Sequence, residues 1–213
     1  MTKKLLFIIA SILLYWVLVN YIPYGALVVY PITLLVTIFH ETGHALFALI
    51  TGGSVHGIQI NNNGSGYAMV AGGLSLLVIP GGYIGSAIWG NLLLFVALYK
   101  EKYIIWILYL IMLVLIFSGI VWFNSLGSTI LLIVFAGLFY WLSKAKKSVQ
   151  VYSLLAIGAT TLFYIILDFN GGPSSDLAHF TSLLPILPQL GWAIIWLAVV
   201  SYITYLNIRR SWK

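Results

Sequence analysis

Charged residues are scarce in this chain, and cysteine is absent. Asp, Glu, Lys and Arg make up only 7% of the 213 residues, whereas a typical soluble domain contains about 25% charged residues. Because 62% of the residues are hydrophobic, almost no length remains for a soluble domain, and the composition indicates an integral membrane protein. The lack of cysteine excludes disulfides and thiolate metal sites.

The basic residues point to membrane topology and not to nucleic acid as a partner. The chain has ten Lys and Arg against four Asp and Glu, and the basic residues stand in small clusters at the ends of apolar runs, where such residues fix orientation. Lys3 and Lys4 precede a long apolar stretch that lacks a small-residue cleavage site. We therefore expect a retained helix at the amino terminus rather than a cleaved signal peptide.

Seven apolar runs predict an all-α polytopic membrane protein with a single domain over residues 1–213. Two other stretches depart from this pattern. Residues 54–71 place β-type residues around an Asn/Gly turn, which predicts a short β-hairpin. Residues 169–187 are rich in Gly and Pro and predict an irregular or re-entrant segment, which must be buried in protein or line a cavity. The predicted spans are residues 5–22, 25–51, 74–99, 103–123, 127–143, 149–168 and 188–207.

The second span contains the motif HExxH, formed by His40, Glu41 and His44. Residues i and i+4 share one helix face, so both imidazoles can bind one Zn²⁺. Glu41 can take a proton from a metal-bound water and later pass it to the leaving amine. Ionisable groups inside a membrane are costly and usually functional, which favours a zinc site over a pair of buried histidines capped by a glutamate.

A catalytic zinc needs a third protein ligand, and the candidates are His56, Asp168, Asp176 and His179. Four predicted spans cross the membrane between the motif and residues 169–187. Because this number is even, the end of the motif helix and residues 169–187 lie on the same side of the membrane. An aspartate there can therefore reach the metal. The residues alone leave both aspartates open, while His56 is expected at the surface and His179 can instead hydrogen-bond a ligand.

With these motifs the chain resembles the site-2 protease family of intramembrane zinc metallopeptidases, specifically its compact bacterial branch. The resemblance spans most of the chain and is carried by "HETGHALFALITGGSVHGIQI", "GSGY", "GGYIGSAIWGNLLL", "FNSLG" and "SDLAHFTSLLPILPQLGWAIIWL". It implies a multi-pass protein of the bacterial cytoplasmic membrane that uses Zn²⁺ to hydrolyse peptide bonds within or beside the bilayer. His40 and His44 would be ligands, and Glu41 would be the general base.

The resemblance also implies roles for two further residues. Asp176, in the late "SD" element, would complete the metal site and is preferred over Asp168. Better-known members carry the third ligand in an "LDG" element, of which "LDFNGG" at Asp168 is only a loose echo. Asn124 matches a polar position that contacts substrate backbone, and it serves equally well as a cap for the helix that starts near Gly127.

Glycines and the hairpin carry further expectations. Gly52 and Gly53 are predicted to end the motif helix. An edge strand within residues 54–71 is either a solvated loop or a site that holds an unwound substrate by backbone pairing. Close packing against the motif helix is predicted for Gly81, Gly82, Gly85 and Gly90.

Orientation is left open by the sequence. If successive helices cross the membrane in alternating directions, Lys3 and Lys4 lie on the same side as residues 54–71 and 169–187, the loops beside the metal site. The other eight basic residues then lie on the opposite side. Positive-inside counting then puts the amino terminus and the site's opening outside the cytoplasm, whereas the better-characterised relatives imply a cytoplasmic opening.

The sequence therefore predicts a zinc metalloprotease whose partners are the bilayer and a membrane protein or peptide substrate. One alternative is a zinc-binding scaffold or adaptor without catalysis. Another is a small transporter with a metal site, which would need polar groups on several helices where the chain has few. The sequence names no substrate and no oligomeric state.

Overall fold

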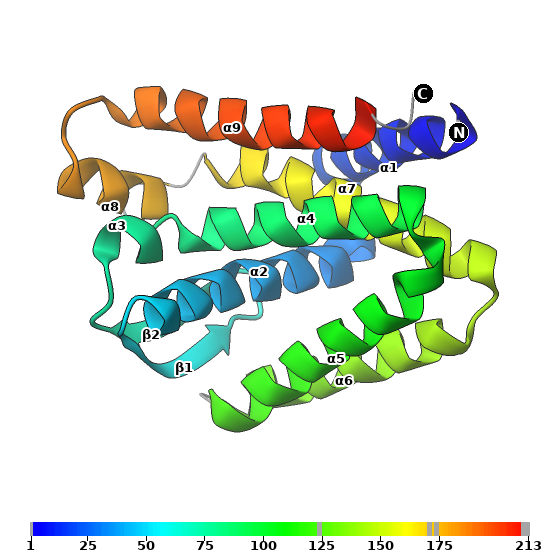
Figure 1. Ribbon diagram of the computed structural model, residues 1–213, viewed down its shortest axis with the longest axis horizontal. Coiled ribbons are helices and arrows are strands. Elements are labelled where there is room, and N and C mark those ends of the chain that lie inside the picture. Colours follow the sequence, from blue (N-terminus) through cyan, green and yellow to red (C-terminus); the bar gives the residue numbers. More distant parts are fainter. Residues whose placement is uncertain (1, 123–124, 170–171, 173–174, 210–213) are drawn as a thin grey trace.

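The structure, a computed structural model, describes all residues except 1, 123–124, 170–171, 173–174 and 210–213. Within this described part, seven helices are long and apolar enough to cross a membrane, which confirms the predicted all-α multi-pass architecture. They are α1 (Thr2–Tyr21), α2 (Gly25–Ile50), α4 (Gly81–Tyr99), α5 (Ile104–Val121), α6 (Leu126–Lys144), α7 (Lys147–Asp168) and α9 (Gln189–Arg209) (Figure 1). The shorter elements are β1 (Ser54–Ile60), β2 (Gly66–Ala71), α3 (Ser75–Val78), the 3₁₀ helix η1 (Glu101–Tyr103) and α8 (Asp176–Leu183).

The predicted span 74–99 is divided into the short helix α3 and the spanning helix α4. The chain turns before α3 at Gly72 and Gly73, whose φ angles are 72° and 79°. Pro80 has no amide hydrogen to donate into a continuing helix, and α4 begins at the next residue. Because α3 has only 4 residues, this break adds no crossing.

Helices α2, α4 and α7 pack at backbone contact through glycines. A Cβ built on Gly43 of α2 would lie 2.4 Å from the carbonyl oxygen of Gly81, and one built on Gly85 would lie 2.7 Å from the Gly43 Cα. These contacts confirm the predicted packing of Gly81 and Gly85 on the motif helix. Gly90 instead packs on α7, where a Cβ on Gly158 would lie 2.9 Å from the Gly90 oxygen.

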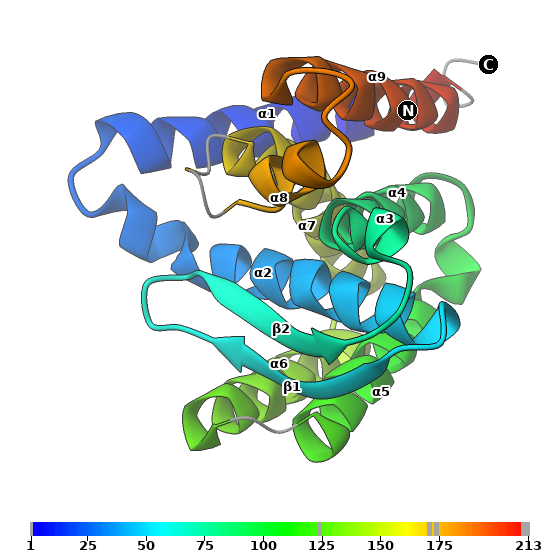
Figure 2. The ribbon, with the colours of Figure 1, turned by 90° about the vertical axis from the view of Figure 1, so that its left-hand side faces the viewer.

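The β-hairpin lies between α2 on one side and the helices α5 and α6 on the other (Figure 2). The N–H of Ile58 donates to the Trp122 carbonyl at 3.0 Å, and the N–H of Ile60 donates to the Ser128 hydroxyl at 3.0 Å. These bonds occupy the side of β1 that faces away from β2. The outer edge of β1 is therefore covered, while β2 forms the other edge of the two-stranded sheet.

Helix α6 begins at Leu126, and its N-cap is Ser125. The Ser125 side-chain oxygen accepts a hydrogen bond from the Ser128 N–H at 3.2 Å, as expected of a capping serine. Ser125, one residue after the predicted cap Asn124, therefore holds the N-cap position. Asn124 itself lies outside the described residues.

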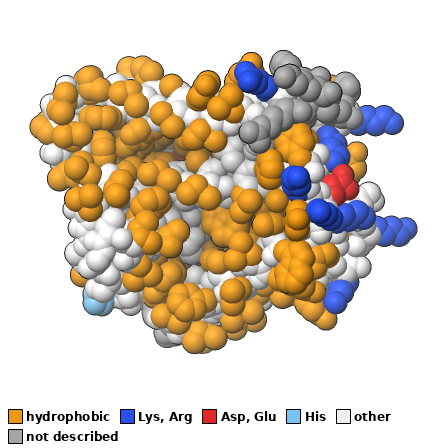
Figure 3. All heavy atoms as spheres, viewed as in Figure 1, with side chains coloured by type: hydrophobic (Ala, Val, Ile, Leu, Met, Phe, Trp, Pro, Cys, Tyr) orange, Lys and Arg blue, Asp and Glu red, His pale blue; other side chains and the backbone are white. Residues whose placement is uncertain are grey.

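The amino terminus of α1 lies at the end of the bundle opposite the hairpin. Lys4 Nζ lies 2.7 Å from Glu101 Oε1 and also donates to the Ala97 carbonyl at the end of α4. Lys147, at the start of α7, donates to the Glu101 carbonyl. The visible Lys and Arg side chains gather towards this end of the molecule (Figure 3). The predicted position of Lys3 and Lys4 beside the metal-site loops is therefore wrong.

Counting crossings failed for α1 because it assumed that α1 and α2 run in opposite senses. Ring contacts of Phe7 with Tyr152 and of Tyr15 with Phe163 show that α1 runs in the same sense as α7. Helix α2 also runs towards the hairpin end, because β1 follows its last turn. In Figure 2, α1 lies above α2, and the connection 22–24 joins them at the left of the view.

This placement makes a testable prediction about sidedness. The chain has no cysteine, so single cysteines can replace the exposed Lys3, Asn62 and Ser148. We expect Lys3→Cys and Ser148→Cys to react on the cytoplasmic side, because Lys and Arg are retained there, and Asn62→Cys on the other side. Labelling of intact and permeabilised cells with a membrane-impermeant maleimide measures this. If the single variants Lys3→Cys and Asn62→Cys were labelled from the same side of the membrane, the placement of α1 would be contradicted.

Candidate metal centre

The last turns of α2 carry the HExxH motif and end as the sequence predicts. His40 and His44 are separated by one helical turn, so both rings leave the same face. Gly52 then adopts a φ of 85°, and the Gly53 N–H donates to the Ala48 carbonyl at 2.8 Å. This left-handed glycine stops the helix and turns the chain back into β1 along α2.

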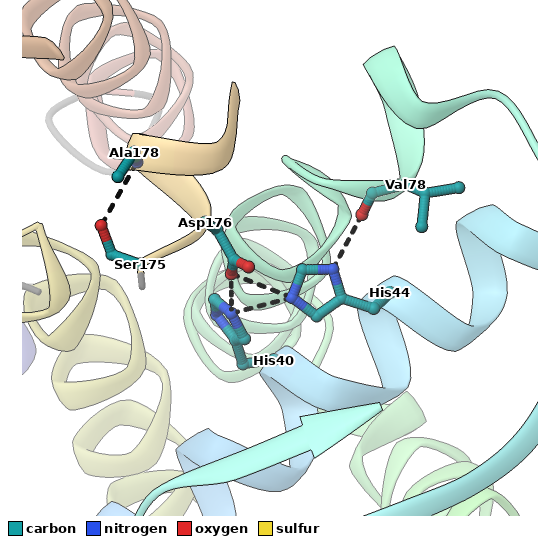
Figure 4. Close-up of polar contacts among 6 residues, drawn as sticks. All are labelled: His40, His44, Val78, Ser175, Asp176 and Ala178. Carbon is teal, nitrogen blue, oxygen red and sulfur yellow. Dashed lines mark hydrogen bonds and ion pairs between the residues drawn. The ribbon is translucent and has the colours of Figure 1, made fainter. Parts of the chain in front are cut away.

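Asp176 brings a carboxylate from the other end of the chain to both imidazoles. Its Oδ2 lies 2.9 Å from His40 Nε2 and 3.0 Å from His44 Nε2, and the two Nε2 atoms are 3.1 Å apart (Figure 4). One ligand atom of each residue lies within 4.8 Å of the others, so the three could hold a single metal ion. As the even number of crossings predicts, Asp176 of α8 therefore lies on the same side as the histidines and within reach of them.

The ring of His44 is held in the tautomer that a metal ligand requires. His44 Nδ1 lies 2.7 Å from the carbonyl oxygen of Val78 in α3. A carbonyl can only accept, so Nδ1 carries the proton, and the Nε2 of the neutral ring keeps its lone pair facing Asp176. Two imidazoles and one carboxylate are a usual ligand set for catalytic zinc, with one position left for water. The residues present therefore fit Zn²⁺.

The three side chains lie at a cavity of about 650 Å³. Glu41 also lines this cavity, although its side chain is only 5% exposed. The hairpin contributes Gly66 and Ala68 to the wall, and the irregular segment contributes Ser175, the N-cap of α8. Both segments therefore line a polar cavity beside the metal centre, as the sequence predicts.

The other candidate ligands lie apart from the histidine pair. Asp168 and His179 line the same cavity but do not join the metal-binding group formed by the described residues. His56 is exposed on β1, with its Nε2 3.2 Å from the Ser54 hydroxyl. The geometry therefore favours Asp176 as the third ligand, which is the choice that the resemblance implied.

The carboxyl of Asp176 is held in the ionised form. Burial would raise its pKa, but the two histidines, when they are protonated and no metal is bound, hydrogen-bond to the carboxylate and lower its pKa well below the ordinary value. An ionised carboxylate is the form that binds a metal cation.

Most of the chain also matches a known family. The Peptidase M50B-like family matches over residues 5–207. The chain belongs to this family. Membership confirms the resemblance to site-2 proteases and makes the chain a membrane metallopeptidase. No curated protein and no solved structure matches the chain.

Two glycines of this M50B-like peptidase bring backbone against the catalytic motif. A Cβ on Gly82 would lie 2.3 Å from His40 Nε2, and a Cβ on Gly66 would lie 2.9 Å from the Cγ of Glu41. The sequence indicated Gly82 only as a helix-packing residue and did not single out Gly66. Both stand in short glycine-rich pieces, "GGYIG" and "GSGY", which were the available signal.

Replacing Gly82 by alanine tests this contact in the M50B-like peptidase. The added methyl group must displace the His40 ring, so we expect Gly82→Ala to lower zinc affinity by about tenfold or more, as losses of supporting contacts around metal ligands do. Competition with a chelator on detergent-purified protein measures the affinity. Gly137→Ala is the matched control, because a Cβ there meets nothing within 4 Å. Equal zinc affinity in Gly82→Ala and wild type would contradict the role assigned to this contact.

Proposed function

We propose that this peptidase hydrolyses peptide bonds in membrane-embedded or membrane-adjacent segments, with Zn²⁺ held by His40, His44 and Asp176. The observation that carries the proposal is the approach of Asp176 Oδ2 to both Nε2 atoms at 2.9 and 3.0 Å. The seven apolar helices support a location in a membrane, and we propose the bacterial cytoplasmic membrane.

The side chains divide the work of hydrolysis among them. Zinc, when bound, supplies a Lewis acid that polarises the peptide carbonyl and lowers the pKa of water. Glu41 takes the proton of the attacking water and delivers it to the nitrogen of the leaving amine as the C–N bond breaks. The Val78 carbonyl holds the His44 ring, and the cavity admits water to a site that apolar helices surround.

Glu41→Gln separates catalysis from metal binding. Glutamine has nearly the same shape but cannot take up the proton, so we expect cleavage to fall by at least about a hundredfold while zinc content stays at the wild-type level. Metal analysis and cleavage of a transmembrane peptide on the same detergent-purified samples measure both.

Two further variants are the controls for this experiment. His44→Ala and Asp176→Ala should lose both zinc and activity, because each removes a proposed ligand. A Glu41→Gln protein that retains full cleavage would refute the role of Glu41 as the general base. If the wild type cleaved no peptide and Glu41→Gln preserved the function of the protein in cells, the non-catalytic scaffold would be favoured.

Strand β2 offers a place to hold the unwound substrate. Proteolysis of a helical segment requires local unwinding, because a helix keeps its carbonyls in internal hydrogen bonds. Strand β2 lines the cavity through Gly66 and Ala68, next to Glu41. We infer that an extended substrate segment pairs with this edge beside the zinc.

The register of the hairpin supports this inference. Ile58 lies opposite Ala68, and Ile60 lies opposite Gly66. The N–H groups of both isoleucines point away from β2, since they donate to partners on the far side. In an antiparallel ladder, directly opposed residues share this outward orientation. The N–H and C=O groups of Gly66 and Ala68 therefore point away from β1. Within the described part of the chain they have no hydrogen-bond partner, so they can pair with an added strand.

Ala68→Pro tests the pairing. Proline removes the outward N–H without removing a hydrogen bond to β1, so we expect cleavage of a transmembrane peptide to fall about fivefold or more, consistent with loss of one hydrogen bond of about 1 kcal/mol. Zinc content should not change. Ala68→Ser keeps the N–H and is the matched control. Undiminished cleavage by Ala68→Pro would show that β2 does not bind substrate through this group.

The opening of the site follows from the position of the basic residues. The cavity lies at the hairpin end, whereas Lys4 and Lys147 lie at the opposite end beside Glu101. Since the basic side is retained in the cytoplasm, we propose that substrates are cut from the extracytoplasmic side. Asn124 stays a predicted contact for substrate backbone.

A further inference from the structure

Tyr83 connects the two halves of the metal centre. It lies in the first turn of α4, and it is only 3% exposed. Its ring stands edge-on to the ring of His40, with the centroids 5.0 Å apart and an interplanar angle of 83°. On its other sides the ring contacts Phe169, which follows α7, and Trp196 of α9, at 4.8 and 5.4 Å.

The Tyr83 hydroxyl lies beside the backbone next to Asp176. Its two polar neighbours are the Leu177 N–H and the Asp168 carboxylate. The first amides of a helix have no partner within the helix. In α8 the Ser175 hydroxyl accepts from the Ala178 N–H at 3.2 Å, and the Tyr83 oxygen is the side-chain atom beside the Leu177 N–H. Both side chains therefore contact the first turn of α8.

Helix α8 needs such an external anchor. It has only 8 residues, and an isolated helix of this length is not stable in water. A Gly/Pro-rich stretch precedes it and separates it from α7. The position of the Asp176 carboxylate therefore depends on contacts that α8 makes with other helices, and the Tyr83 hydroxyl supplies one at the residue next to Asp176.

We propose that Tyr83 is a positioning residue for the metal centre. Its ring fixes the His40 imidazole, and its hydroxyl fixes the turn of α8 that carries Asp176. Asp168 orients this hydroxyl and does not bind the metal. This proposal rests on the proposed function, because it assumes that zinc binds His40, His44 and Asp176.

Tyr83→Phe and Asp168→Val test the two polar contacts of this hydroxyl. Tyr83→Phe keeps the ring and loses the hydroxyl, so we expect zinc to bind about tenfold more weakly, as found when supporting partners of metal ligands are removed. Asp168→Val should have the same effect, while Asp168→Asn should restore near wild-type affinity because the amide oxygen still accepts from Tyr83. Chelator competition on the detergent-purified full-length protein measures zinc affinity.

A matched control and a double variant separate positioning from general stability. Tyr152→Phe alters a tyrosine of α7 that packs on Phe7 at a centroid distance of 4.7 Å and should bind zinc like the wild type. Because Tyr83 and Asp168 act as one unit, Tyr83→Phe combined with Asp168→Val should bind zinc no more weakly than either single variant. A merely structural effect would lower the thermal unfolding midpoint without changing zinc affinity.

The outcomes distinguish the two proposals. Wild-type zinc affinity in Tyr83→Phe, or additive losses in the double variant, would overturn the positioning role and leave the proposed function intact. Wild-type protein that does not bind zinc at one ion per chain would overturn the proposed function itself, and the positioning role with it.

Discussion

Ionised groups inside an apolar bundle can persist only where they compensate one another, and this constraint organises the molecule. Two imidazoles of α2 and one carboxylate of α8 meet at distances of 2.9, 3.0 and 3.1 Å. An uncompensated charge at such a depth would be costly. The chain must therefore bring its second membrane helix and the short helix α8 together before the site exists at all. Long-range architecture, and not only the local motif, makes the metal centre.

Close backbone approach is the means by which the bundle achieves this. Gly43 meets Gly81 and Gly85, so α4 lies directly on the motif helix. Gly82 leaves room for the His40 ring, and Gly66 lets β2 come up to Glu41. The glycines thus set the distance between the cavity walls and the side chains of His40 and Glu41. In a membrane, where helices gain little from burying apolar surface, such close packing also supplies much of the attraction between helices.

The sequence was most informative where the physics is local. Helical periodicity places His40 and His44 on one face whatever the remaining chain does, and the hairpin and the end of α2 follow from glycine and asparagine positions. Asp168 and Asp176 could not be separated by periodicity, because both flank the same irregular segment. Their separation depends on α8, whose short helix sets Asp176 against the histidines.

The errors had the same origin in long-range packing. Lys4 contacts Glu101, far along the chain, and α1 does not follow the rule that neighbouring helices alternate in direction. Tyr83 carried no motif of its own, and only the fold shows that it contacts His40. Counting crossings nevertheless succeeded for α4 to α7, where each helix is joined to the next by a short connection.

The covered edge of β1 has a consequence for how molecules meet. Exposed strand edges invite one sheet to join another, a common route to aggregation. Here the Trp122 carbonyl and the Ser128 hydroxyl already occupy the N–H groups on one margin of the hairpin, and the other margin lines the cavity at the metal centre. Two copies of the protein cannot stack their hairpins into a growing ribbon, and the sheet can lengthen by a single guest strand at most.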